Sequence, residues 1–238
     1  MSLTKFSDLP QRMQNPSVEF YYNLLLKKQG ALRAKRLFDL ALSALLLALL
    51  SPVMAVVALA VILDSEGGAV FRQERVAQFG RPFVIYKFRT MRPGAERGSG
   101  VTLPGDGRVT RIGGFLRKTR LDELPQLINV LLGDMSFVGP RPELLRYVRQ
   151  YDDAALATLL VPQGITSPAS LRFRNEDRFL AGSSPERIYT ELILPRKAAL
   201  NLRYIEMLSP LEDLCIMAET LLPPRWKTKY IDGIRDPR

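Results

Sequence analysis

The stretch LALSALLLALLSPVMAVVALAVIL, residues 40–63, lies between Asp39 and Asp64 and contains no charged side chain. As a straight helix rising ~1.5 Å per residue it would extend roughly 36 Å, enough to cross a hydrocarbon core of about 30 Å. Because it is apolar on every face, it differs from the amphipathic surface helices of soluble proteins. It also starts too late and runs too long for a secretory signal peptide. The stretch therefore predicts a helix embedded in a membrane.

Ser51-Pro52 divides this helix, predicted over residues 37–63, into two halves of about 16 Å each. Proline removes a backbone hydrogen bond and clashes with the preceding turn, so we expect a kink whose freed polar groups are satisfied by Ser51 or by neighbouring helices. Basic residues flank both ends: Lys27, Lys28, Arg33, Lys35 and Arg36 before the helix, and Arg72, Arg75, Arg81, Lys87 and Arg89 after it. Because basic flanks tend to stay in the cytoplasm, both ends would lie on that side. We therefore expect a re-entrant helix, with an ordinary kinked span as the alternative.

Composition limits the chemistry that the chain can perform. Its 34 Lys and Arg residues outnumber 24 Asp and Glu residues, giving a net charge of +10, which favours an anionic partner such as nucleic acid, phospholipid headgroups or a phosphorylated substrate. The absence of histidine excludes Ser-His-Asp hydrolysis, histidine bases and histidine-ligated zinc. The single cysteine, Cys215, stands in an apolar helical pattern and is expected in the core. Catalysis would therefore rest on carboxylates, Lys, Arg, hydroxyls and an oxygen-binding metal.

Periodicity and turn residues predict an α+β protein that is mainly helical, with a short β-hairpin. The expected elements are a hairpin around a turn at residues 78–82, a Gly-rich mobile loop at 92–108, helices at 124–132 and 142–160, a loop with a short strand at 162–177, and helices at 185–207 and 209–222. The expected parts are an amphipathic, interfacial segment at 1–34, one folded domain at 35–222 and a tail at 223–238 that contains Trp226 and Tyr230.

An acidic pair, Asp122-Glu123, stands among basic residues in TRLDELPQLINVLLGDMSFVGPRPE, residues 119–143. Asp122 suits a helix N-cap and Glu123 a first helical turn, so capping alone is one explanation. The alternative is a catalytic pair. Lys87, Arg89, Arg117 and Arg141 are candidate phosphate ligands, and cations within ~4–6 Å would lower both carboxylate pKa values. An ionised Asp can attack a phosphoryl group whose charge is screened by Mg²⁺.

From about Lys35 to Leu222 the sequence closely resembles the monotopic phosphoglycosyl transferases, a bacterial sugar transferase family, in its small catalytic form. The residues that carry the resemblance occur in order: the apolar helix with Ser51-Pro52, FRQERVAQFGRPFVIYKFRTM, FLRKTRLDELPQLINVLLGDMSFVGPRPE, PQGITSPASLRFRNED and the closing helix. Together these motifs are highly specific, whereas the two letters DE alone would carry no information.

The resemblance implies a monotopic enzyme of the bacterial inner membrane, with its active site facing the cytoplasm at headgroup level. It would move a sugar 1-phosphate from a nucleotide diphosphate-sugar, usually a UDP-sugar, to polyprenyl phosphate and release UMP, which begins glycan assembly. Asp122 would be the nucleophile that forms a covalent phosphosugar intermediate. Glu123, beside Asp122, would belong to the Mg²⁺ site. The four cations Lys87, Arg89, Arg117 and Arg141 would hold the diphosphate or the acceptor phosphate.

Three questions stay open at the level of sequence. The resemblance implies that sugar choice depends in part on the segment from Pro162, where Asn175 and Glu176 either meet the sugar or bond at the surface. A membrane-anchored binding protein and a catalytically silent scaffold are the other function classes, and divalent-metal dependence would separate them from an enzyme. The cations follow the apolar helix and the acidic pair rather than exposed aromatics, so we expect no nucleic acid. Lipid or a second protomer would cover the apolar helix, which leaves a homodimer open.

Overall fold

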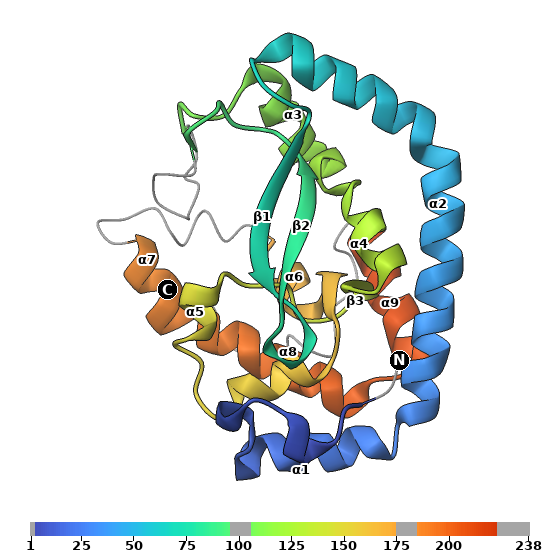
Figure 1. Cartoon of the computed structure of the whole chain (residues 1–238), viewed down its shortest axis with the longest axis vertical. Coiled ribbons are helices and arrows are strands. Elements are labelled where there is room, and N and C mark those ends of the chain that lie inside the picture. The colour runs from blue at the N-terminus through green and yellow to red at the C-terminus, as the bar shows by residue number, and fades with distance from the viewer. Residues whose placement is uncertain (1–2, 96–105, 175–184, 223–238) are drawn as a thin grey trace.

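The computed structural model of the 238-residue chain describes residues 3–95, 106–174 and 185–222 (Figure 1). The α-helices are α1 (Pro16–Leu26), α2 (Gln29–Asp64), α3 (Arg111–Thr119), α4 (Gln126–Leu132), α5 (Leu145–Val148), α6 (Pro168–Arg172), α7 (Pro185–Ile188), α8 (Leu194–Met207) and α9 (Pro210–Leu221). Shorter turns are the 3-10 helices η1 (Phe6–Asp8), η2 (Gln11–Met13), η3 (Gln78–Gly80), η5 (Leu121–Glu123) and η6 (Ala155–Leu160), and the π-helix η8 (Tyr189–Ile193). This mainly helical architecture with small sheets confirms the predicted fold class.

Two small sheets lie within this helical framework. Strands β1 (Val70–Val76) and β2 (Pro82–Phe88) form the predicted antiparallel hairpin, in which Val70 pairs with Phe88 and Val76 with Pro82. Strands β3 (Met135–Val138) and β4 (Gln163–Thr166) pair in parallel, with Met135 opposite Gln163. The sequence predicted a short strand near β4 but missed β3, because all four β3 residues are buried and show no alternation of polar and apolar positions.

Helix α2 runs as one long arc along an edge of the molecule (Figure 1). It continues through Ser51 and Pro52, so the proline does not end the helix as a break would. Pro52 has no amide to donate to the carbonyl of Ala48, four residues earlier, and the Ser51 hydroxyl donates to that same carbonyl at 2.9 Å. The side chain of Ser51 thus replaces the lost backbone bond, as the sequence suggested.

The first turns of α2 are fixed to the rest of the protein by polar contacts. Lys35 Nζ lies 2.7 Å from Asp213 Oδ2 of α9. The guanidinium of Arg36 donates to the last carbonyls of α4 at 2.6 and 2.9 Å. Asp39 Oδ1 accepts the backbone N–H of Phe137 in β3 at 3.1 Å. The first turns of α2 are therefore part of the folded domain, because they bond to α9, α4 and β3.

The last turns of α2 return to the same folded unit. Asp64 Oδ2 accepts the backbone N–H of Ile112 in the first turn of α3 at 2.9 Å, where a carboxylate complements the helix N-terminus. Arg89, directly after β2, donates to the carbonyl of Ser65 at 2.7 Å. Val57 and Val61 form a second, smaller apolar cluster with residues of β2 and α3. Both ends of the long helix are thus held by one domain.

The middle of α2 presents large apolar side chains outward. Leu45, Leu49 and Val56 are each more than 60% exposed, and only 11% of the most apolar window of the helix is buried. Within the described residues, α2 is the one helix that is long and apolar enough to cross a membrane. Low burial distinguishes it from the core helix of a soluble protein. Re-entry into a membrane stays a prediction.

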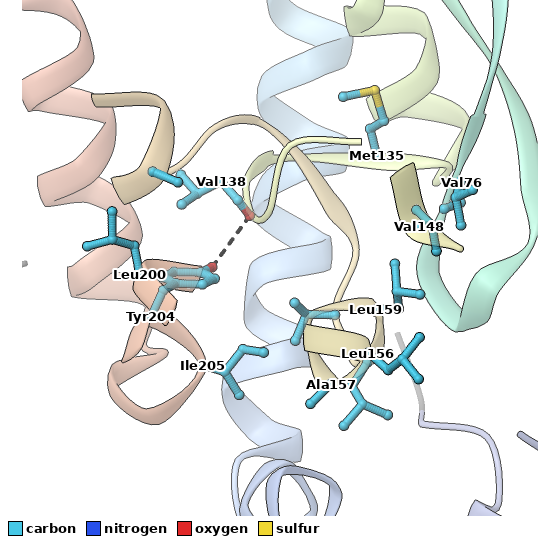
Figure 2. Close-up of a cluster of buried hydrophobic side chains, with 14 of the residues drawn as sticks. Val76, Met135, Val138, Val148, Leu156, Ala157, Leu159, Leu200, Tyr204 and Ile205 are labelled. Atoms are coloured by element: carbon cyan, nitrogen blue, oxygen red, sulfur yellow. Dashed lines mark hydrogen bonds between the residues drawn. The ribbon is translucent and has the colours of Figure 1, made fainter. Parts of the chain in front are cut away.

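The main core lies where α1, η6, α8 and β3 meet. Figure 2 shows Leu200, Tyr204 and Ile205 of α8 on one side of this core and Leu156, Ala157 and Leu159 of η6 on another. The Tyr204 hydroxyl oxygen lies 3.4 Å from the carbonyl oxygen of Val138. Helix α1 also packs here, with its three buried residues Val18, Tyr22 and Leu25. One face of α1, within the segment predicted to lie at the membrane interface, therefore packs against the protein core.

Two expectations from the sequence are wrong. Residues 142–160 do not form one helix: α5 ends at Val148, and Asp152 Oδ1 then accepts the backbone N–H of Ala155 at 2.7 Å, which starts a separate 3-10 turn. Cys215 is exposed rather than buried, because α9 turns Asp213 and Ile216 inward instead. In both cases local chemistry or helix orientation outweighed the apolar pattern.

Candidate active site

A cavity of about 440 Å³ opens where β1, β2, η5 and α8 converge with the chain segments that follow β2 and β3. Ten basic and three acidic side chains are among the described residues that line it. The basic residues are Arg75, Lys87, Arg89, Arg92, Arg108, Arg117, Arg120, Arg141, Arg174 and Lys197, and the acidic ones are Asp122, Glu123 and Glu143. Such an excess of positive charge suits an anionic ligand, and paired phosphates suit it best.

The acidic pair lies in η5, the tight turn between α3 and α4. Arg120 adopts the left-handed conformation with φ of 61° and redirects the chain at the end of α3. Helix α4 begins at Gln126, and the residue before it, Pro125, makes no side-chain cap. Asp122 therefore caps no helix, and the capping explanation is wrong. Asp122 and Glu123 are buried, with 8% and 9% exposure, and both line the cavity.

Glu123 is surrounded by cations. Its carboxylate lies 3.1 Å from Lys87 Nζ and 3.9 Å from Arg120 Nη1, and it also forms a close ion pair with Arg141. Burial alone would raise the pKa of Glu123, but Arg141 and Lys87 outweigh burial and hold that pKa well below its usual range. Glu123 is therefore ionised and occupied by partners from β2 and from the segment after β3.

Asp122 differs from its neighbour. Its Oδ1 is buried and has no hydrogen-bond partner among the described residues. Burial, followed by repulsion from Glu123, raises the pKa of Asp122, although Lys87, Arg117 and Arg120 oppose the shift. The expectation that cations lower both carboxylate pKa values is therefore right for Glu123 and wrong for Asp122. A buried carboxylate oxygen without a hydrogen-bond partner destabilises the protein unless a bound ligand interacts with it.

The four cations predicted from the sequence all line the cavity, but they are used differently. Lys87 and Arg141 bind Glu123, and Arg117 Nε donates to Thr90 Oγ1 at 2.8 Å. Arg89 donates to the backbone at the end of α2, as described above. Burial, partly offset by Glu123, lowers the pKa of Lys87. Three of the four cations thus surround the acidic pair, and Arg89 links this region to the apolar helix.

Residues 30–223 match the model of a protein family described as bacterial sugar transferase. The chain belongs to this family. The match covers α2, the hairpin, the acidic pair and both closing helices, α8 and α9. It confirms the resemblance that the motifs around Asp122 and Glu123 indicated.

Three relatives of this bacterial sugar transferase carry functional names. A Bacillus subtilis protein, provisionally named undecaprenyl-phosphate N-acetylgalactosaminyl 1-phosphate transferase, is 45% identical over 53% of this chain and 73% of its own length. Proteins named UDP-glucose:undecaprenyl-phosphate glucose-1-phosphate transferase occur in Caulobacter vibrioides and Escherichia coli. The former is 39% identical over 79% of this chain and 68% of its own length. The latter is 46% identical over 58% of this chain but only 30% of its own length.

At this site a magnesium ion would meet one open carboxylate oxygen, Asp122 Oδ1, and would have to be held mainly by a substrate. Among the described residues no group of three His, Cys, Asp or Glu side chains could hold a metal by itself. Mg²⁺ commonly takes one or two carboxylates and completes its shell with phosphate oxygens and water. The partnerless Asp122 Oδ1 could supply one such carboxylate, whereas the Glu123 carboxylate already pairs with Lys87 and Arg141.

The sequence missed several residues that line the cavity. Arg120 stands two residues before Asp122 and could have been found by its position, but no residue type marks its left-handed backbone in advance, because it is not a glycine. Glu143 ends the motif at residues 119–143 but was not singled out. Tyr189 and Lys197 reach the cavity from a segment distant in sequence, where no motif marks them. The predicted mobile loop, the possible sugar contacts Asn175 and Glu176, and the tail with Trp226 and Tyr230 lie wholly or largely outside the described residues.

Proposed function

We propose that this chain transfers a sugar 1-phosphate from a UDP-sugar to undecaprenyl phosphate, releasing UMP, by way of a covalent intermediate on Asp122. The names of its relatives support the donor and acceptor classes. The observation that carries the mechanism is the contrast between the two buried carboxylates. Glu123 is satisfied by cations, whereas Asp122 keeps an oxygen without a partner in a cavity built for anions.

The proposed reaction has two displacements at one phosphorus atom. A carboxylate oxygen of Asp122 attacks the sugar-linked phosphorus, the bond from that phosphorus to the bridging oxygen breaks, and UMP leaves with the electron pair. An oxygen of undecaprenyl phosphate then attacks the same phosphorus and expels the Asp122 carboxylate unchanged. A raised pKa makes the Asp122 carboxylate a stronger nucleophile than a solvated one, while nearby Arg117 and Lys87 stabilise negative charge on the phosphate oxygens.

The cations and the metal would each bind some of the diphosphate oxygens. Arg117 and Arg141 present planar guanidinium groups, which grip phosphate in pairs of hydrogen bonds, and Lys87 offers a compact charge. Mg²⁺, held by Glu123 or Asp122 together with the donor, would supply further charge neutralisation. The ion pairs of Glu123 keep Lys87 and Arg141 in place before a donor binds.

The acceptor is a lipid, so the cavity must lie near a membrane surface. Both ends of α2 are fixed to the catalytic domain, whereas its middle exposes apolar side chains, which supports a helix that enters the bilayer and returns. Basic residues on both flanks favour the cytoplasmic side of the inner membrane. There a soluble UDP-sugar could meet a lipid phosphate.

The proposal is tested by measuring UMP release from purified protein in lipid nanodiscs, with a panel of UDP-sugars and with or without undecaprenyl phosphate. We expect sustained release that requires the lipid and stops when a chelator removes divalent metal. A binding protein or scaffold would release no UMP under any of these conditions, and that result would refute the proposed activity.

A further inference from the structure

A second group of buried polar residues lines the same cavity and has no role in the chemistry at Asp122. Glu143, Tyr189 and Lys197 are each less than 10% exposed and all face the cavity. The Tyr189 hydroxyl donates to Glu143 Oε1 at 2.6 Å, and Lys197 Nζ donates to the Tyr189 hydroxyl at 3.3 Å. Lys197 also lies 4.7 Å from the centre of the Tyr189 ring. These contacts form an ordered chain that ends at the Glu143 carboxylate.

An unusual backbone holds Tyr189 in this position. Tyr189 begins the π-helix η8, in which the backbone N–H of Leu194 bonds to the carbonyl of Tyr189. Pro195 follows directly, and in an ordinary α-helix its ring would clash with the carbonyl of Glu191. The wider turn avoids that clash. Such π turns are rare and occur frequently at functional sites.

The backbone around Glu143 is fixed on both sides. The carbonyl of Glu143 accepts the backbone N–H of Val76 at 3.0 Å, at the end of β1. Arg75 Nη1 donates to the carbonyl of Pro142 at 3.2 Å. With its main chain held by β1 and Oε1 held by Tyr189, the Glu143 side chain has a defined direction, and Oε2 can accept from a ligand.

The charge of Glu143 identifies the part of the donor that it meets. A carboxylate repels phosphate, so it does not belong to the phosphate contacts of the surrounding cations. Carboxylates accept strongly from hydroxyl groups, and a UDP-sugar carries hydroxyls on its hexose and on its ribose. Glu143 is two residues from Arg141, at most about 7 Å along the chain, and Arg141 binds Glu123 beside the nucleophile. The hexose is attached to the reacting phosphorus, whereas the ribose lies beyond the second phosphate.

We infer that Glu143 binds a hydroxyl group of the donor hexose, and that Tyr189 and Lys197 are positioning residues that orient its carboxylate. This inference rests on the proposed function for the identity of the donor. A purely structural role for the same three residues would leave the affinity for the sugar unaffected.

The test compares the binding of UDP-sugars with that of UDP to the full-length Asp122→Asn protein in nanodiscs, by calorimetry in the presence of Mg²⁺. This parent is used because it cannot form the covalent adduct, so the heat reports binding alone. The variants are Glu143→Gln, Tyr189→Phe and, as a control, Glu186→Gln, which changes an exposed carboxylate. For Glu143→Gln we expect UDP-sugar affinity to fall about 10- to 100-fold with UDP affinity unchanged. Tyr189→Phe should show the same selective loss, about fivefold, and Glu186→Gln no loss. Thermal unfolding verifies that each variant is folded.

Three other outcomes would contradict the inference. Equal losses for UDP and UDP-sugars would place Glu143 at the nucleotide or in the framework, and no loss would remove it from the site. If the Asp122→Asn parent binds UDP and UDP-sugars equally, the hexose makes no contact. If the parent binds UDP-sugars selectively through Glu143 but the unaltered protein releases no UMP, the inference stands and the proposed transferase activity fails.

Discussion

Two clusters of buried charge differ in how completely their charged groups are paired. The anchor cluster, Lys35, Asp213 and Tyr204, pairs one cation with one carboxylate at 2.7 Å, and the Tyr204 hydroxyl donates to the other carboxylate oxygen at 2.7 Å. The site cluster, Asp122 and Glu123 with the cations around them, contains one satisfied carboxylate, one partnerless oxygen and an excess of positive charge. Both are buried. The Lys35–Asp213 pair is balanced, although Asp39 beside it also has a buried oxygen, Oδ2, without a partner among the described residues. Only the site cluster lines a cavity with an excess of positive charge.

The difference separates a structural role from a binding role. A balanced, hydrogen-bonded pair fixes α2 to α9 and has no remaining capacity for a ligand. An unbalanced cluster is costly in the empty protein and gains most when an anion and a metal complete it. Of the four predictions below, three test this contrast and the last tests the helix that the anchor cluster holds; they begin with the largest expected effect.

Replacing Asp122 with Asn should reduce UMP release at least about 10⁴-fold, because an amide oxygen is a far poorer nucleophile toward phosphorus. The same change removes a buried charge whose Oδ1 has no partner, so thermal stability should rise by about 1 kcal/mol, or ~2–4 °C. Both effects are measured on one preparation, by UMP release and by thermal unfolding.

Glu123→Gln is the matched control for the stability effect. It removes the partner of Lys87 and Arg141, so it should lower rather than raise the unfolding temperature. Equal stability changes for the two neighbouring carboxylates would show that the contrast between them is not real.

Replacing Asp213 with Asn should destabilise the protein by up to about 3–5 kcal/mol, because Lys35 loses its ion pair at 2.7 Å and only the Asp39 carboxylate remains near this buried charge. Asparagine keeps an acceptor for the Tyr204 hydroxyl, so the loss of stability reflects the missing negative charge rather than a missing hydrogen bond. Adding Lys35→Met should recover most of the stability, measured by thermal unfolding in nanodiscs. A single-variant cost below about 1 kcal/mol would show that the pair does not anchor α2.

The rate of the covalent step should fall on acidification, about tenfold per pH unit below the pKa of Asp122, because only the ionised carboxylate attacks. Burial raises this pKa, so the decline should begin above the usual range of Asp. The sign agrees with the stability prediction, since a raised pKa in the folded state means that ionised Asp122 costs stability above it. Rapid-quench measurement of UMP release, without lipid acceptor, gives the profile. A midpoint at or below 3.8 would contradict the raised pKa.

Ser51→Ala should cost about 1 kcal/mol without changing UMP release, because the carbonyl of Ala48 then has neither the Ser51 hydroxyl nor an amide at position 52. Ser43→Ala is the control: the Ser43 hydroxyl donates to the carbonyl of Leu40, which also has its ordinary helical partner. Equal costs for the two changes would mean that the hydroxyl does not replace the missing bond.

The sequence predicted those features that depend on neighbours along the chain. The charge-free run of α2, the hairpin and the adjacent acidic pair all have local signatures, and the structure contains each of them. The parallel pairing of β3 with β4 and the turn at Asp152 depend on long-range packing or on one side-chain hydrogen bond. The opposite environments of Asp122 and Glu123 could not be predicted, because both depend on which distant cations fold against them.

Intact-protein mass spectrometry tests the central claim most directly. The purified protein is mixed with Mg²⁺ and a UDP-sugar in the absence of lipid acceptor, beside the Asp122→Asn variant. We predict a mass increase equal to one sugar phosphate on the unaltered protein, lost on adding undecaprenyl phosphate and absent from the variant. An adduct that persists in Asp122→Asn, or lipid-dependent UMP release without any adduct, would contradict the role assigned to Asp122.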